Sequence, residues 1–157
     1  MLFFLLKCLL GIVAALILLG VLRTWQMGHS ADQKRFLAAT APAPAPDGSY
    51  AGTVASPHVS WLGKKFNAAD SSGINVFDTS NGTKVERYPF ATSSGKGLTD
   101  RDLNVLKIDY NVSANPFWLR PILDEIVQIG PDHYLGKMQA RVIPGYPFTL
   151  AFFELTR

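Results

Sequence analysis

The chain begins with one continuous apolar run. Residues 1–22 contain a single charged residue, Lys7. As an α-helix this run would be about 33 Å long, which is enough to cross a hydrocarbon layer of roughly 30 Å. Lys7 lies near one end, where its ammonium group can reach the headgroups, and Trp25 follows the other end, where indole rings favour the interface. The pattern predicts a transmembrane helix within residues 1–23.

A cleaved signal peptide is the main alternative to a retained anchor, because Lys7 and residues 8–22 match its charged and apolar regions. Cleavage requires small residues soon after the apolar run, but residues 23–27 read Arg-Thr-Trp-Gln-Met. A lipoprotein would use Cys8, yet Lys7 precedes it directly. We therefore expect a retained single-pass anchor in the inner (cytoplasmic) membrane. A short N-terminal tail before such a helix favours a domain on the periplasmic or extracellular side, although basic residues flank both ends of the helix.

The next stretch, residues 24–46, is polar and ends in three Ala-Pro pairs. Proline lacks the backbone N–H and restricts the residue before it, so the Ala-Pro run cannot be helical. It predicts an extended spacer of roughly 3 Å per residue. We expect three parts: a transmembrane anchor over 1–23, a polar stalk and Ala-Pro spacer over 24–46, and a folded domain over 47–157.

The rest of the chain carries short alternations of apolar and polar residues between turn signals, which is typical of antiparallel sheets. The clearest is 103–112, where Leu106 and Tyr110 share one face. The Asn-Gly pair at 81–82 predicts a tight hairpin. Strands are expected at residues 49–55, 61–67, 74–79, 84–92, 103–112, 122–129, 133–142 and 147–155. We predict an all-β domain, an antiparallel barrel of about eight strands, because closure leaves no exposed edge; a two-sheet β-sandwich is the alternative.

Composition and charge exclude some functions. The chain has 15 Lys and Arg against 12 Asp and Glu, a net charge of +3, and its charged fraction of 17% is low for a soluble domain. Beyond residue 47 there are 11 basic and 10 acidic residues, so the domain lacks the dense basic face that nucleic-acid binding requires. Cys8 is the only cysteine, which excludes an internal disulfide and a Cys-based metal site.

Several short motifs resemble a family of uncharacterised bacterial proteins. They are Lys107-Ile-Asp-Tyr110, Asn115-Pro116, Leu119-Arg120, Asp124-Glu125 and Tyr134-Leu-Gly-Lys137, with Trp61-x-Gly-Lys64-x-Phe66 and Gly73-x-Asn75-x-Phe77 upstream. The overall pattern is similar to lipocalin-like proteins of the calycin type, and the resemblance covers residues 48–157. It implies an eight-stranded ligand-binding barrel but no established activity. The Gly-x-Trp signature of lipocalins appears only as Gly48-x-Tyr50.

Catalytic chemistry finds little support in the sequence. The three histidines do not show metal-ligand spacing, and there is no Gly-x-Ser-x-Gly nucleophile motif. Asp124 and Glu125 are adjacent, so on a strand they face opposite ways and cannot work as a paired acid and base. We expect no catalytic residue, no metal and no cofactor; an enzyme of unknown class is the third of three functional hypotheses.

The first hypothesis is a membrane-anchored protein that binds a lipid or another hydrophobic small molecule inside the barrel. The second is a structural or accessory subunit that joins a membrane-protein partner through its anchor and outer face. For the first, we expect the ligand to be lined by Tyr110, Trp118, Tyr134 and Met138. Arg120 and Asp124 are the expected polar pair at the rim of the barrel, where a headgroup would be oriented.

Overall fold

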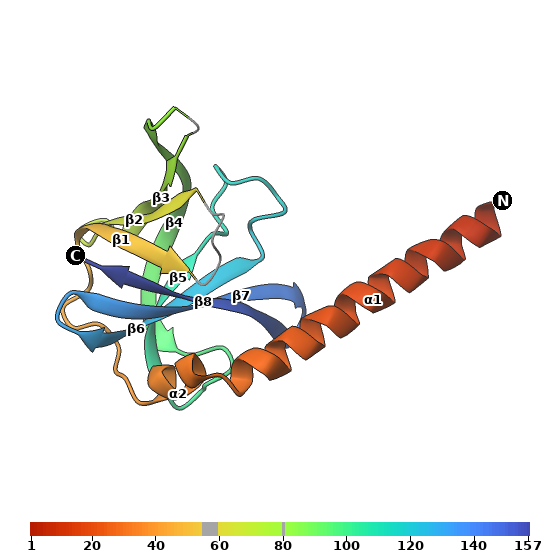
Figure 1. Cartoon of the computed structure of the whole chain (residues 1–157), viewed down its shortest axis with the longest axis horizontal. Coiled ribbons are helices and arrows are strands. Elements are labelled where there is room, and N and C mark those ends of the chain that lie inside the picture. Colours follow the sequence, from red (N-terminus) through yellow and green to blue (C-terminus); the bar gives the residue numbers. More distant parts are fainter. Residues whose placement is uncertain (55–59, 80) are drawn as a thin grey trace.

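A computed structural model describes residues 1–54, 60–79 and 81–157, and it contains two helices followed by eight strands (Figure 1). The helices are α1 (Leu2–Gly28) and α2 (Ala31–Leu37). The strands are β1 (Gly48–Val54), β2 (Trp61–Asn67), β3 (Ser72–Asp78), β4 (Lys84–Lys96), β5 (Asn104–Asp109), β6 (Ile122–Gly130), β7 (His133–Ile143) and β8 (Tyr146–Thr156).

The strands form a closed antiparallel barrel in chain order. Each strand pairs with the next, and β1 closes the barrel against β8, with Ala51 opposite Thr156 and Val54 opposite Phe153. The predicted eight-stranded barrel is therefore confirmed, and the sandwich alternative is excluded. The arrangement is consistent with a calycin-like fold.

The interior of the barrel is filled largely by aromatic rings. Tyr50, Phe66, Phe90 and Tyr134 are each at most 4% exposed, and neighbouring rings meet edge to face at centroid separations of 5.3–5.9 Å. Edge-to-face contacts between aromatic rings add stabilisation beyond the area that they bury. These packed rings close one part of the interior and leave the remainder for the site described below.

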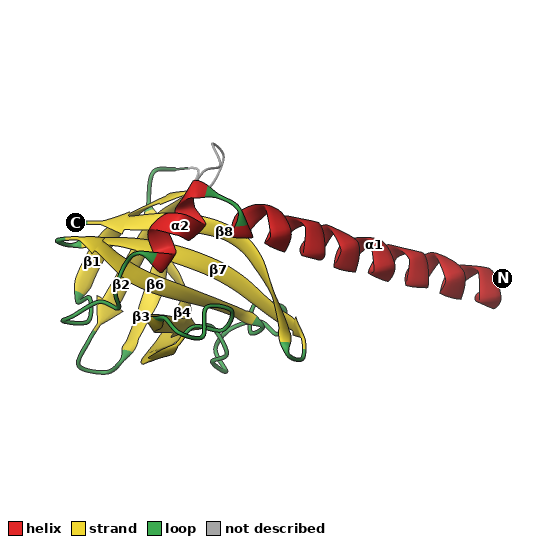
Figure 2. Ribbon diagram, turned by 90° about the horizontal axis from the view of Figure 1, so that it is seen from below, coloured by secondary structure: helices red, strands yellow, loops and turns green. Residues whose placement is uncertain are grey.

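A second apolar cluster lies on the outside of the barrel, beneath α2. Phe36 of α2 is fully buried against Val105, Val127 and Leu135, which project from the outer faces of β5, β6 and β7. Ser30 caps this helix by accepting a hydrogen bond from the Gln33 backbone N–H at 3.1 Å. Figure 2 shows α2 lying across the barrel wall.

The stretch that we expect to be a stalk and spacer, 24–46, thus lies against the barrel over much of its length. Besides α2, the Thr40 carbonyl accepts a hydrogen bond of 2.7 Å from the Gln128 backbone N–H. The Ala43 backbone N–H donates to the Gln128 side chain at 3.3 Å. The three-part division at residues 23 and 46 stays a prediction.

Helix α1 is long and apolar enough to cross a membrane. A secretion signal near the N-terminus would meet the same criterion of length and composition. Its last turns pack on β8. The Arg23 Nε–H donates to the Leu150 carbonyl at 2.8 Å, and the Thr24 hydroxyl accepts from the Thr149 N–H at 3.0 Å. Gly20 lies against the Phe148 ring, where a Cβ atom would be only 3.1 Å from ring carbons.

Candidate functional site

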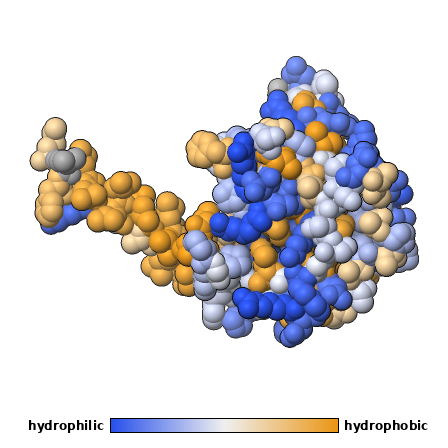
Figure 3. Space-filling view, turned by 180° about the vertical axis from the view of Figure 1, so that it is seen from behind, coloured by the Kyte–Doolittle hydropathy of each residue, from blue (hydrophilic) through white to orange (hydrophobic). Residues whose placement is uncertain are grey.

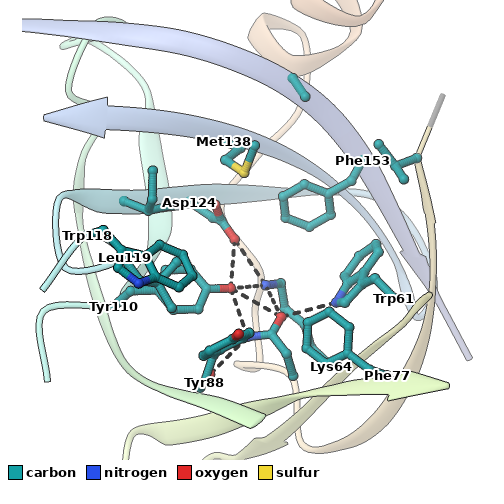
Figure 4. A pocket seen from close by; sticks show the side chains of 14 residues that line it. Trp61, Lys64, Phe77, Tyr88, Tyr110, Trp118, Leu119, Asp124, Met138 and Phe153 are labelled. Atoms are coloured by element: carbon teal, nitrogen blue, oxygen red, sulfur yellow. Dashed lines mark hydrogen bonds and ion pairs between the residues drawn. The ribbon is translucent and has the colours of Figure 1, made fainter. Parts of the chain in front are cut away.

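A cavity of about 300 Å³ occupies one end of the barrel interior (Figure 4). Its wall is predominantly apolar and draws on strands β1 to β4 and β6 to β8 and on the loop between β5 and β6. The aromatic lining residues are Trp61, Phe77, Tyr88, Tyr110, Trp118 and Phe153. Such a volume is at the lower end of the range for small-molecule sites and equals about ten water molecules at ~30 Å³ each.

Four polar side chains meet in the wall of this cavity: Lys64, Asn75, Tyr110 and Asp124. Lys64 and Asp124 form an ion pair at 3.0 Å with both side chains only 3% exposed. Figure 4 shows the lysine, the tyrosine hydroxyl and the carboxylate pointing toward one another. A charged pair so far from water is costly unless its remaining hydrogen-bonding capacity is filled.

The hydrogen-bond donors of this cluster are all engaged within it. The Lys64 ammonium group has three N–H donors, and its three acceptors are Asp124 Oδ2, Asn75 Oδ1 at 2.9 Å and the Tyr110 hydroxyl oxygen. The Asn75 amide donates to the Tyr88 carbonyl at 2.9 Å and to the Tyr110 oxygen at 3.1 Å. The Trp61 Nε1–H donates to Asn75 Oδ1 at 3.1 Å.

One acceptor in the cluster is left over. Asp124 Oδ1 is buried and has no hydrogen-bond partner among residues 1–54, 60–79 and 81–157, while Oδ2 of the same carboxylate accepts from both Lys64 and Tyr110. An unsatisfied buried acceptor on a carboxylate costs free energy, and a ligand whose donor reaches Oδ1 by displacing the side chains that cover it removes that cost. The cluster is therefore suited to receive a hydrogen bond, not to give one.

Burial shifts the titration of two members of the cluster. Desolvation lowers the pKa of Lys64, and the charge and hydrogen bond of Asp124 partly offset this effect. The pKa of Tyr110 is raised well above its ordinary value, mainly by desolvation and then by the nearby Asp124 charge. Tyr110 thus remains a neutral phenol at physiological pH.

The expected ligand-lining residues fall into two groups. Tyr110, Trp118, Met138 and Asp124 all line the cavity. Tyr134 does not: it packs edge to face on Tyr50 in the filled part of the barrel, at a centroid separation of 5.3 Å. The sequence places Tyr134 correctly on an inward face but does not show how far along the barrel axis it lies.

The expected rim pair of Arg120 and Asp124 does not form. The guanidinium of Arg120 donates to the carbonyls of Asn115 at 3.0 Å and Ser113 at 2.9 Å, and so closes the loop in which it lies. Asp124 is 2% exposed and is paired with Lys64 in the interior, not at the rim. Arg141 is bound by both carboxylate oxygens of Asp109 instead.

From the sequence alone, Lys64 fits either a structural ion pair or a polar contact with a ligand. A local signal for its inward direction exists, because Phe66 lies two residues later on the same strand and is a core aromatic. Asn75 and Trp61 occur in the motifs of the family resemblance, but they were not among the expected ligand-lining residues. Their roles depend on the register of β2 and β3, which sets Lys64 opposite Asn75.

A second buried polar cluster lies outside the barrel, beneath α2. Lys137 is 1% exposed and is paired with Asp100, while its ammonium group also faces the Phe36 ring. Glu125 is fully buried and accepts hydrogen bonds from the Leu98 N–H at 2.6 Å and the Gln139 amide at 3.1 Å. Asp124 and Glu125 therefore face opposite sides of β6, as predicted. This outer cluster joins α2 and the β4–β5 loop to the barrel wall.

Metal-binding geometry is not found in the described part of the chain. Across residues 1–54, 60–79 and 81–157, no group of three His, Cys, Asp or Glu side chains is placed to hold a metal ion.

Comparisons with known proteins bear on the fold. No protein-family model matches the chain, and no curated protein matches it. A crystal structure of a protein from Thermomonospora curvata matches with a TM-score of 0.54 and 17% sequence identity, over 76% of this chain and 79% of that one. At this level of identity the likeness concerns the fold, and it supports the eight-stranded barrel.

Proposed function

We propose that the barrel binds a small hydrophobic molecule that carries a hydrogen-bond donor. The observation that supports this function is the apolar cavity of about 300 Å³ whose one unsatisfied polar atom is Asp124 Oδ1, counted over the described residues. Apolar walls favour a hydrocarbon body, and a few fixed polar atoms orient it.

The hydrogen-bond inventory defines the chemistry of the polar end of the ligand. A hydroxyl or amine group donates to Asp124 Oδ1 and removes its deficit. A carboxylate brings a second negative charge next to Asp124 and finds no free N–H on Lys64, whose three donors already have acceptors. We therefore expect apolar alcohols or amines to bind in preference to fatty acids.

We further propose that the protein acts by binding and not by catalysis. The N–H and O–H donors of the cluster are all engaged by nearby acceptors, and the ion pair with Asp124 opposes the lowering of the Lys64 pKa by burial. Asp124 is the group that touches the ligand, and Lys64, Asn75 and Tyr110 hold its carboxylate in position.

The location of this site follows from a retained α1, which we propose to be a single-pass anchor in the inner membrane with the barrel on its periplasmic or extracellular side. The contact of Gly20 with the Phe148 ring of β8 supports retention, because cleavage anywhere after residue 22 would remove a part of α1 that packs on the barrel. N-terminal sequencing of the mature protein tests retention, and a start after residue 22 would refute it. A reporter that works only in the cytosol can be fused after Arg157. Activity of this reporter would refute the periplasmic or extracellular location of the barrel.

Native mass spectrometry of the full chain, extracted in mild detergent, tests the proposed function. We expect a bound apolar molecule at one copy per chain, released on unfolding. A stoichiometric protein partner with an empty barrel would favour the accessory-subunit function instead, and a ligand-free monomer would contradict the proposal.

A further inference from the structure

One end of the barrel carries the connections β1–β2, β3–β4, β5–β6 and β7–β8, because consecutive strands run antiparallel. Helix α1 leaves the barrel at this end, where Gly20 contacts Phe148 near the beginning of β8. In Figure 1 the β7–β8 hairpin and the β5–β6 loop both lie on the side toward which α1 extends.

The β7–β8 hairpin lies beside the apolar part of α1, level with residues 13–17 of the helix. An apolar groove separates the two, with Val13 and Ile17 on the helix side and Val142 and Ile143 on the hairpin side. Among the described residues that line this groove, Arg23 is the charged one. Val13 is ten residues before Arg23, which is about 15 Å along a helix. If α1 spans a bilayer, the hairpin tip lies below the headgroups.

The side chains at this end suit such a position. Val142 is 58% exposed, Tyr146 47%, Phe117 81% and Trp118 57%, which are large exposed fractions for apolar residues. Residues 142–148 and 111–119 contain no charged residue. Figure 3 shows hydrophobic side chains along the helix up to the barrel and a further hydrophobic projection on the helix-facing side of the barrel.

Basic side chains follow directly behind the apolar tips. Arg141 precedes Val142, and Arg120 follows the Phe117–Trp118 loop. Arg141 is held by Asp109 and Arg120 by carbonyls of its own loop, so the membrane-facing character of this end comes from its exposed aromatic and aliphatic side chains. Aromatic rings are enriched where proteins meet the bilayer interface. A lipid bilayer is the occupant that this surface favours, because the neighbouring helix α1 is long and apolar enough to cross one.

The cavity opens at the same place. Trp118 is both exposed and part of the cavity wall, and Leu119 and Ile122 of the same loop and the adjacent strand line it too. An apolar molecule in the bilayer, near the headgroups, could enter the cavity at this mouth without passing through water. This route costs less free energy than transfer through water, because apolar surface stays out of water throughout.

We propose that the β7–β8 hairpin tip and the Phe117–Trp118 loop form a second membrane-contact surface beside α1, and that this surface presents the cavity mouth to the bilayer. The bilayer contact depends on α1 and on the exposed residues at this end of the barrel. The role of the cavity mouth rests on the ligand-binding function proposed above. A test of the bilayer contact that needs no ligand separates the failure of one proposal from the failure of the other.

The test uses spin labels on the full chain, reconstituted into vesicles of phosphatidylcholine and phosphatidylglycerol. In a Cys8→Ser background, single cysteines replace Phe117, Val142 or Ala69. Ala69 is an exposed position on the β2–β3 turn, at the opposite end of the barrel, and serves as the matched control. Collision rates of each nitroxide with oxygen, which enters hydrocarbon, and with a neutral nickel chelate, which stays in water, report the surroundings of the label.

We expect the oxygen-to-nickel ratio at positions 117 and 142 to exceed that at 69 by about tenfold, because a polar complex is excluded from hydrocarbon. Ratios equal to that of position 69 would overturn the proposal and leave the ligand-binding function untouched. Protection from both reagents would also overturn it, because it would show that another protein covers the surface. All three positions are exposed, so the cysteine substitutions leave the fold intact.

Discussion

The ion pair between Lys64 and Asp124 predicts a separation of stability from ligand binding. Replacing Lys64 with Met removes the ammonium group and leaves the Asp124 carboxylate buried, with the Tyr110 hydroxyl at 3.2 Å as its remaining donor. Stranding one member of a buried pair costs about 3–5 kcal/mol of unfolding free energy. We expect this loss for Lys64→Met.

The double variant Lys64→Met with Asp124→Leu should recover most of this loss. It replaces the pair with apolar side chains of similar volume, and such replacements are often neutral or stabilising by about 1–4 kcal/mol. Asn75 and Tyr110 still bond to each other in this variant, and Trp61 still donates to Asn75. The recovered protein should nevertheless bind the ligand at least about tenfold more weakly, which corresponds to one lost hydrogen bond to a charged group.

Lys65 provides the matched control on the same strand. It points outward and forms an ion pair with Glu86 at 3.1 Å, but the two side chains are 54% and 50% exposed. Lys65→Met should therefore cost no more than about 1 kcal/mol.

Denaturant unfolding of the full chain in mild detergent, followed by circular dichroism, measures all three variants. Equal losses for Lys64→Met and Lys65→Met would refute the description of the inner pair as desolvated. Equal losses for the single and double variants would refute the stranded carboxylate as the cause.

Three further predictions concern other parts of the fold. Burial raises the pKa of Glu125 above its usual 4.5, so the protonated side chain contributes stability below pH 4.5, and this contribution is lost as the pH rises through the raised pKa. In unfolding titrations, the stability of Glu125→Gln relative to the parent should therefore increase from pH 4 to pH 8. A difference that does not depend on pH would contradict this. Gly20→Val should lower the thermal midpoint, because its side chain meets the Phe148 ring, whereas Gly11→Val, with nothing within 4 Å of the added Cβ, should leave it unchanged. Tyr134→Ala should cost about 3–5 kcal/mol of stability yet change ligand affinity little, because its ring is outside the cavity; a calorimetric affinity loss larger than its stability loss would place it in the site.

The strand pattern was predictable where one face of a strand is apolar. Leu106, Ile108 and Tyr110 alternate with polar residues and all lie in the inner core. The Ser-Ser-Gly-Lys stretch that ends β4 resembles a loop, yet residues 91–96 pair with β5. That pairing comes from the register of the neighbouring strand, which local composition does not contain.

The outer face of the barrel shows a second limit of sequence reasoning. Lys137 and Gln139 alternate as a solvent-facing pair would, yet both are buried because α2 and the β4–β5 loop cover them. Short helix α2 lies in a stretch whose composition suggests a stalk. Its docking depends on Phe36, Gln33 and Arg35, whose partners on the barrel are distant in the chain.

The site was predictable as a set of inward-facing residues but not as a cluster. Tyr110 and Met138 follow from alternation, whereas the contact of Lys64 with Asp124 joins β2 to β6 across the interior. Charge complementarity alone offered Arg120 as a partner for Asp124. The closed barrel selects Lys64 instead, because it places this side chain on the inner face at 3.0 Å from the carboxylate.

The central claim is that the cavity selects an apolar molecule by a hydrogen bond donated to Asp124, and a matched pair of probes tests it. Trp61 and Trp118 line the cavity, and the third tryptophan, Trp25, lies on α1. In Trp25→Phe the fluorescence therefore reports the cavity only. At pH 8, titration of the full chain in mild detergent with n-octanol should give a saturable change, and octanoate should bind at least about tenfold more weakly. The absence of a saturable change, or equal or tighter binding of octanoate, would contradict the account.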